Sequence, residues 1–106
     1  MEKQELYRVD DSRAGTVASE IEGVWLTKKQ VDVMLFIARA LEQRHYPPTY
    51  EEVRVELGLS TKSLVSYYLS SLERKGLIGH KARVARAMWL TEKGMLFVKR
   101  LETHGA

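Results

Sequence analysis

The stretch Pro47–Leu90 decides the fold, and it reads PPTYEEVRVELGLSTKSLVSYYLSSLERKGLIGHKARVARAMWL. Thr49 and Glu52 have the spacing of a capping box, in which each side chain accepts a hydrogen bond from the other residue's backbone amide. A helix is therefore expected to begin directly after Thr49. Gly58 can adopt the left-handed conformation that commonly ends a helix, so this first helix is short.

A second helix follows after a tight turn. Ser60 or Thr61 is placed to cap its start, and the helix is expected to run to Lys75, where Gly76 ends it. Two helices joined by a turn of about 3 to 4 residues that contains glycine form a helix-turn-helix. The stretch therefore predicts this motif.

The second helix has an apolar face and a polar face. At about 100° per residue, the core-facing positions are Thr61, Val65, Tyr68, Leu69 and Leu72. The opposite face carries Ser63, Ser66, Tyr67, Ser70 and Arg74, with Lys62 near the helix start and Leu64 at the margin. Contact with solvent alone is the usual role of a polar face. Surface helices are normally rich in Glu and Lys, however, and the shortage of both here favours contact with DNA.

A basic hairpin is expected after this helix, with strands Leu77–Lys81 and Arg86–Leu90. Period-2 alternation indicates that Ile78, Met88 and Leu90 face inward, whereas His80 and Trp89 are expected to face outward. The cations at the tip are Lys81, Arg83 and Arg86, with no carboxylate near them in the sequence. Beside a helix-turn-helix, such a hairpin looks like a wing that contacts phosphates or enters a minor groove.

A linked series of short motifs between about Leu26 and Leu90 resembles the winged-helix DNA-binding domain of the LexA repressor. The motifs are LTxxQ, FI, PPTxxE, LGLS, LExKGLI and RAxxL. The resemblance implies a mainly α fold with a small β-hairpin, a three-helix winged helix whose Thr61–Lys75 helix lies in the major groove of double-stranded DNA. It carries the base-reading positions onto Thr61, Ser63, Leu64, Ser66 and Tyr67. Asn and Glu, common at some of these positions in the family, are absent, so the SOS operator is not the expected target.

Contacts to the DNA backbone are expected from the cations around this face and from the wing. These residues are Lys62, Arg74, His80, Lys81, Arg83 and Arg86. Residues 58–106 hold nine basic and three acidic residues, a net charge of +6, whereas residues 1–24 hold three basic and six acidic residues, a net charge of −3. A positive half that coincides with the predicted motif is typical of a DNA-binding protein.

The segment after the wing differs from LexA, which continues into a self-cleaving protease domain that also dimerises. Here the segment begins LTEKG, which is similar to MarR- and PadR-like regulators. We expect an additional C-terminal helix from Thr91 to about Glu102, with more apolar surface than one packing face needs. A homodimer is therefore expected through Trp89, Phe97, Val98 and Leu101. The alternative is that this helix folds back over the first helix of the domain.

Three regions follow from these patterns. Residues 1–24 form an N-terminal arm, residues 25–90 the winged helix-turn-helix, and residues 91–106 the C-terminal helix. In the arm, Leu6, Tyr7 and Val9 favour a short strand, Val17, Ala18 and Ile21 favour a brief helix, and part of it is expected to be disordered. The domain opens with a second capping box, Thr27 and Gln30, and a helix to about Gln43. Its apolar stripe is Val31, Met34, Leu35, Ala38 and Leu41, with Phe36 and Ile37 widening the apolar side.

Several kinds of chemistry are not indicated. The chain of 106 residues has no cysteine, and its three histidines have no Asp or Glu at metal-ligand spacing. Its serines have no adjacent base to activate them. We therefore expect no metal, cofactor, small-molecule ligand or enzymatic activity. The longest apolar run is far below the ~20 residues that span a membrane, so the chain is expected in the cytoplasm of a prokaryote, on the nucleoid when bound to DNA.

Two functions stay open at this point. The first is a sequence-specific DNA-binding transcriptional regulator, a dimeric repressor in particular. The second is a winged helix used for protein–protein interaction, because a fold does not dictate a function. A positive, uncovered face on the second helix favours DNA, and an apolar, covered face favours protein.

Overall fold

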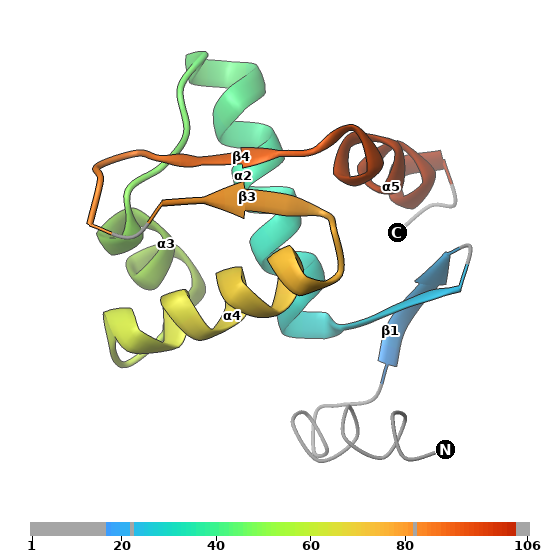
Figure 1. Ribbon diagram of the computed structural model, residues 1–106, viewed down its shortest axis with the longest axis horizontal. Helices are drawn as coiled ribbons and strands as arrows, with labels where there is room; N and C mark the ends of the chain where they lie inside the picture. Colours follow the sequence, from blue (N-terminus) through green and yellow to red (C-terminus); the bar gives the residue numbers. More distant parts are fainter. Residues whose placement is uncertain (1–16, 22, 82, 104–106) are drawn as a thin grey trace.

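The computed structural model describes residues 17–21, 23–81 and 83–103 (Figure 1). Two short strands come first, then three helices, a second pair of strands and a last helix. The elements are β1 (Val17–Ile21), β2 (Val24–Thr27), α2 (Lys28–Arg44), α3 (Tyr50–Leu57), α4 (Lys62–Arg74), β3 (Ile78–His80), β4 (Met88–Leu90) and α5 (Glu92–Thr103). This confirms the predicted mainly α winged helix-turn-helix with an additional C-terminal helix.

The helix starts lie where the capping patterns predicted them. Thr27 accepts a hydrogen bond from the amide of Gln30 at 3.3 Å, and Thr49 accepts one from the amide of Glu52 at 3.0 Å. In both cases the side chain three residues later bonds back to the threonine amide, so both capping boxes are complete. Thr61, rather than Ser60, caps α4, and α3 ends at Gly58 with φ of 66°.

The core lies where α2 meets α3, α4, α5 and the second hairpin. Its fully buried side chains include Leu26, Val33, Met34, Ile37, Val53, Val65, Leu69, Leu72 and Leu77. On α2 the predicted apolar stripe was partly wrong, because the helix buries Val33 and Ala40, which the stripe left out, more deeply than Leu35, Ala38 and Leu41. Ile37, predicted on the apolar side, is buried. The reason is that α2 is covered on more than one side, so its buried surface is wider than a single stripe.

The first hairpin corrects one prediction for the arm. Residues 17–21 form a strand that pairs antiparallel with β2, for example Glu20 with Trp25, and not a brief helix. Lys75, just after α4, donates a hydrogen bond to the carbonyl of Trp25 and so connects α4 to this hairpin. The strand predicted around Tyr7 and the disorder predicted for the arm lie outside the described residues.

The second hairpin, β3 and β4 with its tip at residues 81–87, is the wing. Its strands have three residues each and are shorter than predicted, since the chain turns at Arg83 and Arg86, which have φ of 65° and 54°. The register pairs Gly79 with Trp89 and His80 with Met88. Trp89 lies across Gly79 on the outer face and is 45% exposed, as predicted.

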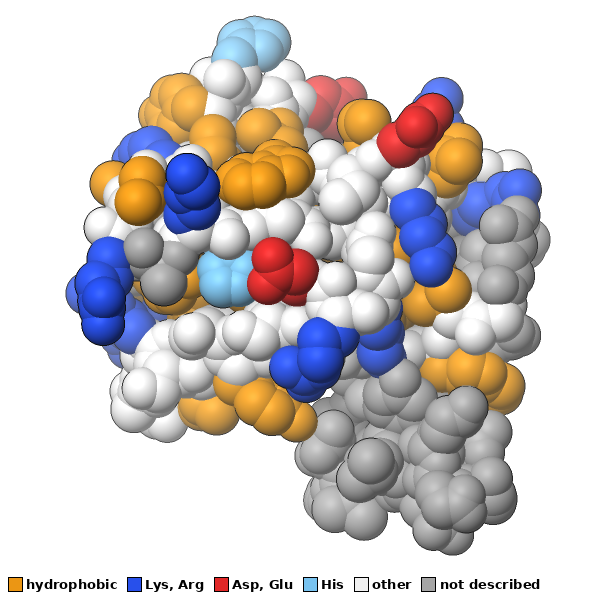
Figure 2. All heavy atoms as spheres, viewed as in Figure 1, with side chains coloured by type: hydrophobic (Ala, Val, Ile, Leu, Met, Phe, Trp, Pro, Cys, Tyr) orange, Lys and Arg blue, Asp and Glu red, His pale blue; other side chains and the backbone are white. Residues whose placement is uncertain are grey.

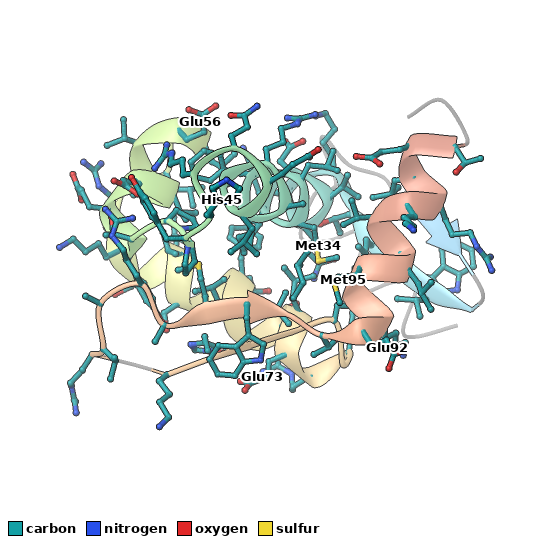
Figure 3. The ribbon with its side chains drawn as sticks, turned by 90° about the horizontal axis from the view of Figure 1, so that it is seen from above. Met34, His45, Glu56, Glu73, Glu92 and Met95 are labelled. Atoms are coloured by element: carbon teal, nitrogen blue, oxygen red, sulfur yellow. The ribbon has the colours of Figure 1, made fainter. Side chains whose placement is uncertain are left out.

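The last helix folds back onto α2 (Figures 1 and 3). Thr91 caps its start by accepting from the amide of Gly94 at 3.0 Å. Phe97, Val98 and Leu101 are buried, with exposed fractions of 4%, 7% and 2%. These three residues were predicted as dimer contacts, and that assignment was wrong, because the inward face of α5 completes the core. Of the described helices, none is long and apolar enough to cross a membrane.

Candidate nucleic-acid interface

The outward face of α4 is open to solvent. Val65, Leu69 and Leu72 turn inward and are fully buried, which leaves Lys62, Ser63, Leu64, Tyr67 and Arg74 exposed and Ser66 half-buried. In Figure 2 the surface over α4 is largely white, the colour of uncharged polar side chains and backbone. Thr61 was predicted both as a core-facing residue and as a base-reading residue. It is exposed and not in the core, and its side chain caps the start of α4. Between residues 61 and 72 this face carries no acidic side chain.

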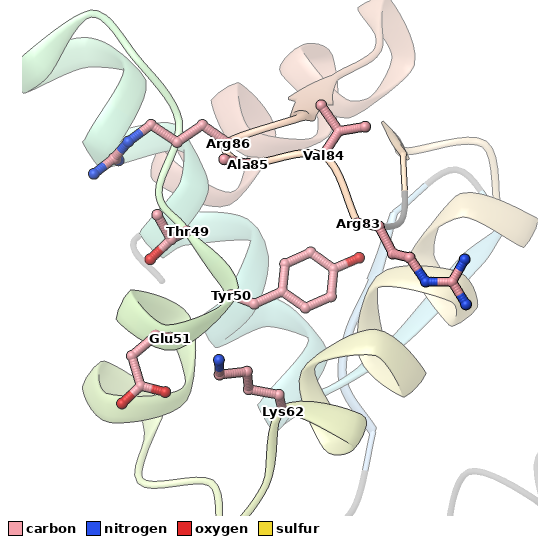
Figure 4. Close-up of a pocket in the computed structure, with 8 residues that line it drawn as sticks. All are labelled: Thr49, Tyr50, Glu51, Lys62, Arg83, Val84, Ala85 and Arg86. Carbon is pink, nitrogen blue, oxygen red and sulfur yellow. The ribbon is translucent and has the colours of Figure 1, made fainter.

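A hollow of about 270 Å³ separates the start of α4 from the wing tip (Figure 4). Its walls come from three elements: Thr49, Tyr50 and Glu51 at the start of α3, Lys62 at the start of α4, and residues 83–86 of the wing. Figure 4 shows Lys62 and Arg83 on opposite sides of the Tyr50 ring. The hollow therefore has a cation from α4 on one wall and a cation from the wing on the other.

Two of the three predicted wing cations stand out in solvent. Lys81 and Arg83 are exposed, and neither side chain forms an ion pair with any residue in the described part of the chain. Val84 beside them is 51% exposed. The exposure of Lys81 and Arg83 at the wing tip agrees with the sequence prediction.

Arg86, the third wing cation, has a different position. Its guanidinium donates to both carboxylate oxygens of Glu52 at 3.1 Å each and to the carbonyl of Pro47 at 2.8 Å. It also lies 4.6 Å from the centre of the Tyr46 ring. No carboxylate is near Arg86 in the sequence, but the fold brings Glu52 to it, so the expectation that Arg86 has no acidic partner was wrong. The hydrogen bond from Arg86, followed by the one from the amide of Thr49, lowers the pKa of Glu52.

His80 also differs from its prediction. Its side chain is 8% exposed and points inward, with Nδ1 at 3.0 Å from the Tyr50 hydroxyl and Nε2 at 3.3 Å from the Glu73 carboxylate. Alternation puts His80 on the same strand face as the buried Ile78, so the outward assignment was wrong. Burial, and secondly the charge of Glu73, raise the pKa of Tyr50. Sequence reasoning did not identify Tyr50 and Glu73 as partners of the wing, because they lie on two other elements.

The comparisons with known proteins agree with this geometry. The family described as the LexA DNA binding domain matches residues 24–87. The chain belongs to this LexA family. It is 44% identical over 63 residues to the LexA repressor of Pelotomaculum thermopropionicum (59% of this chain, 31% of the relative), and 39% identical over 66 residues to that of Lactobacillus acidophilus (62% and 32%). To the LexA repressor of Oenococcus oeni it is 35% identical over 77 residues (73% and 36%).

The LexA match covers β2, the three helices α2, α3 and α4, and most of the wing. The chain spans about a third of the length of these LexA repressors. The resemblance predicted between Leu26 and Leu90 is thereby confirmed. The matched domain is a DNA-binding domain and not a catalytic one, which agrees with the expectation that the chain is not an enzyme.

Proposed function

We propose that the chain is a transcriptional regulator that binds double-stranded DNA sequence-specifically, a repressor that acts as a dimer in the cytoplasm of a prokaryote. The observation that carries the proposal is the outward face of α4, exposed and without acidic residues between residues 61 and 72, in a domain of the LexA family. In this arrangement α4 enters the major groove and the wing tip contacts the adjacent backbone or minor groove. The alternative, a protein-interaction module, is less well supported because most exposed side chains on this face are polar.

Base reading is assigned to Thr61, Ser63, Leu64, Ser66 and Tyr67, which all lie within the first two turns of α4 or at its cap. Backbone contacts are assigned to Lys62, Arg74, Lys81 and Arg83, whose side chains are exposed. Hydroxyl groups can donate to or accept from base edges, and apolar side chains can contact the thymine methyl group. A mixed hydroxyl and apolar face therefore fits the reading of bases better than the binding of phosphates alone.

Substitutions of Ser66 and Tyr67 test the base-reading assignment. After selection of a preferred site from random duplexes, Ser66→Ala or Tyr67→Ala should each weaken binding to that site by about 1–3 kcal/mol and relax the preference at one or two base pairs. Fluorescence anisotropy at fixed salt measures the affinity, and a repeated selection measures the preference. Val55→Ala, an exposed apolar residue on α3, is the control and should change neither quantity.

Unchanged affinity and preference in both variants, with their folding intact, would remove this face of α4 from the interface. A wild-type chain that enriches no duplex at any salt concentration would refute DNA binding itself. Because contacts to phosphates are strongly salt-dependent, the selection is run from low salt upward.

The dimer proposed above needs a surface other than the buried face of α5. The exposed apolar side chains near α5 are Trp89, Met95 and Leu96, at 45%, 50% and 56%. A single module buries only about 600–1,000 Å² of protein surface on DNA, so tight specific binding favours a pair of modules on a two-fold site.

Sedimentation of the intact chain at tens of micromolar should show a dimer that Leu96→Glu dissociates. A monomeric wild type, or a dimer unaffected by both Leu96→Glu and Met95→Glu, would contradict this surface.

A further inference from the structure

The backbone of the wing fixes its orientation only weakly. Each strand has three residues, and a two-stranded hairpin of this length is marginal by itself. The tip adds two residues with positive φ, Arg83 and Arg86, which L side chains adopt at some cost. Contacts between wing side chains and the rest of the domain must therefore set where the tip stands relative to α4.

Two such contacts lie on the two sides of the wing tip, one on the β3 side and one on the β4 side. At the β3 side, His80 is hydrogen-bonded to Tyr50 of α3, and its Nε2 lies 3.3 Å from the carboxylate of Glu73 of α4. At the β4 side, Arg86 bonds to Glu52 of α3. The first contact holds the end of β3, directly before the tip, against the helix-turn-helix, so the position of the β4 side of the tip depends on the second. A guanidinium held by two parallel hydrogen bonds to a carboxylate has a defined orientation that a lysine cannot reproduce.

We propose that Arg86 is a positioning residue for DNA binding, which acts through Glu52 and does not itself contact DNA. The inference rests on the proposed function. The Arg86–Glu52 pair fixes the wing tip opposite the start of α4, so that Lys62 and Arg83 stand on either side of the hollow shown in Figure 4. Contacts that are in place before DNA arrives spare the complex the loss of entropy that ordering the wing on DNA would require.

The substitution of Glu52 distinguishes positioning from direct contact by the sign of its effect. If Arg86 contacted phosphate, removal of the negative charge of Glu52 would leave affinity for DNA unchanged or raise it. If Arg86 acts through Glu52, Glu52→Gln weakens binding. Glutamine is the natural choice, because it can complete the capping box with Thr49 as glutamate does. The capped first turn of α3 is thereby preserved.

A matched pair of wing variants completes the design. Arg86→Gln and Arg83→Gln make the same change of side chain at two positions with positive φ, three residues apart. Arg83→Gln is the direct-contact control and should lower the salt slope of binding by about one unit. Arg86→Lys keeps the positive charge but loses the two parallel hydrogen bonds. Arg86→Lys should therefore keep the wild-type affinity for DNA only if the charge alone matters.

We expect Glu52→Gln and Arg86→Gln each to weaken binding to the selected duplex about tenfold, and the double variant to be no weaker than either single variant. Arg86→Lys should also bind this duplex more weakly than the wild-type chain does. In DNA-free protein, ¹⁵N order parameters at residues 83–85 should fall in Glu52→Gln and Arg86→Gln but not in Arg83→Gln, while those of α2 stay unchanged. Circular dichroism at the assay temperature verifies that every variant is folded.

Three results would overturn the proposal. The first is a Glu52→Gln variant that binds the duplex as tightly as the wild-type chain or more tightly. The others are losses of affinity that add up in the double variant, and an Arg86→Lys variant with wild-type affinity. Failure of the proposed function looks different, since the wild-type chain and the Arg83→Gln control would then bind no selected duplex. In that case the order parameters of the free protein still decide whether Arg86 fixes the wing, and unchanged values would refute that as well.

Discussion

Replacement of Phe97 by glutamate is expected to unfold the domain, whereas the same replacement at the neighbouring Leu96 should leave it folded. Phe97 is 4% exposed and packs in the core beneath α5, while Leu96 is 56% exposed. Loss of a buried phenylalanine costs about 3–5 kcal/mol, and a carboxylate without a partner in an apolar site adds to this. Small domains have total stabilities of about 5–15 kcal/mol, so little or no stability remains.

Thermal and urea denaturation followed by circular dichroism measure this difference. We expect Phe97→Glu to lack a cooperative transition and Leu96→Glu to have a midpoint close to that of the wild-type chain. Because the two positions are adjacent on α5, helix propensity and charge are matched between them. A cooperative transition in Phe97→Glu near the wild-type midpoint would mean that α5 does not pack on α2 as described.

Replacement of Gly94 by alanine should also destabilise the domain strongly, although alanine favours helices by about 1 kcal/mol relative to glycine. A Cβ atom at Gly94 would lie 2.0 Å from the carbonyl oxygen of Leu77, and 3.0 Å from the carbonyl carbon. Both atoms belong to backbone at the start of the wing, so they cannot move without shifting α5 or β3. Overpacking of this kind costs about 1–3 kcal/mol, and more where the neighbour is backbone.

The urea midpoint of Gly94→Ala should therefore fall below that of the wild-type chain. Met95→Ala, at the next position and 50% exposed, is the control and should stay within about 0.5 kcal/mol. An increase in stability on Gly94→Ala, as helix propensity alone predicts, would show that α5 is not in close contact with the carbonyl of Leu77.

The parts of the fold that the sequence predicted correctly depend on residues close together in the chain. The capping boxes at Thr27 and Thr49 involve side chains three residues apart, and Gly58 acts on its own backbone. The burial of Val65 and Leu69 follows from helical periodicity. Each of these signals can be evaluated without knowing where the rest of the chain lies.

The incorrect predictions concern contacts between distant residues. Arg86 was assigned to DNA because no carboxylate is near it in the sequence, yet Glu52 is its partner from 34 positions away. The apolar surface of α5 was read as an interface because the sequence does not show that α2 lies against it. Residues 17–21 have a spacing that suits a helix, and they form a strand because β2 offers them a partner. His80 was the exception, since strand alternation alone was enough to place it inward.

The two ends of the wing tip are held to each other by the backbone. The amide of Lys81 donates to the carbonyl of Ala87 at 2.9 Å, which closes the loop by backbone alone. When the ends of a flexible loop are already held together, doubling its length costs only about 0.6 kcal/mol of closure entropy. Related sequences can therefore lengthen or shorten this loop with little penalty to folding. The reach of the wing can then change by insertion and deletion, separately from α4 and the core.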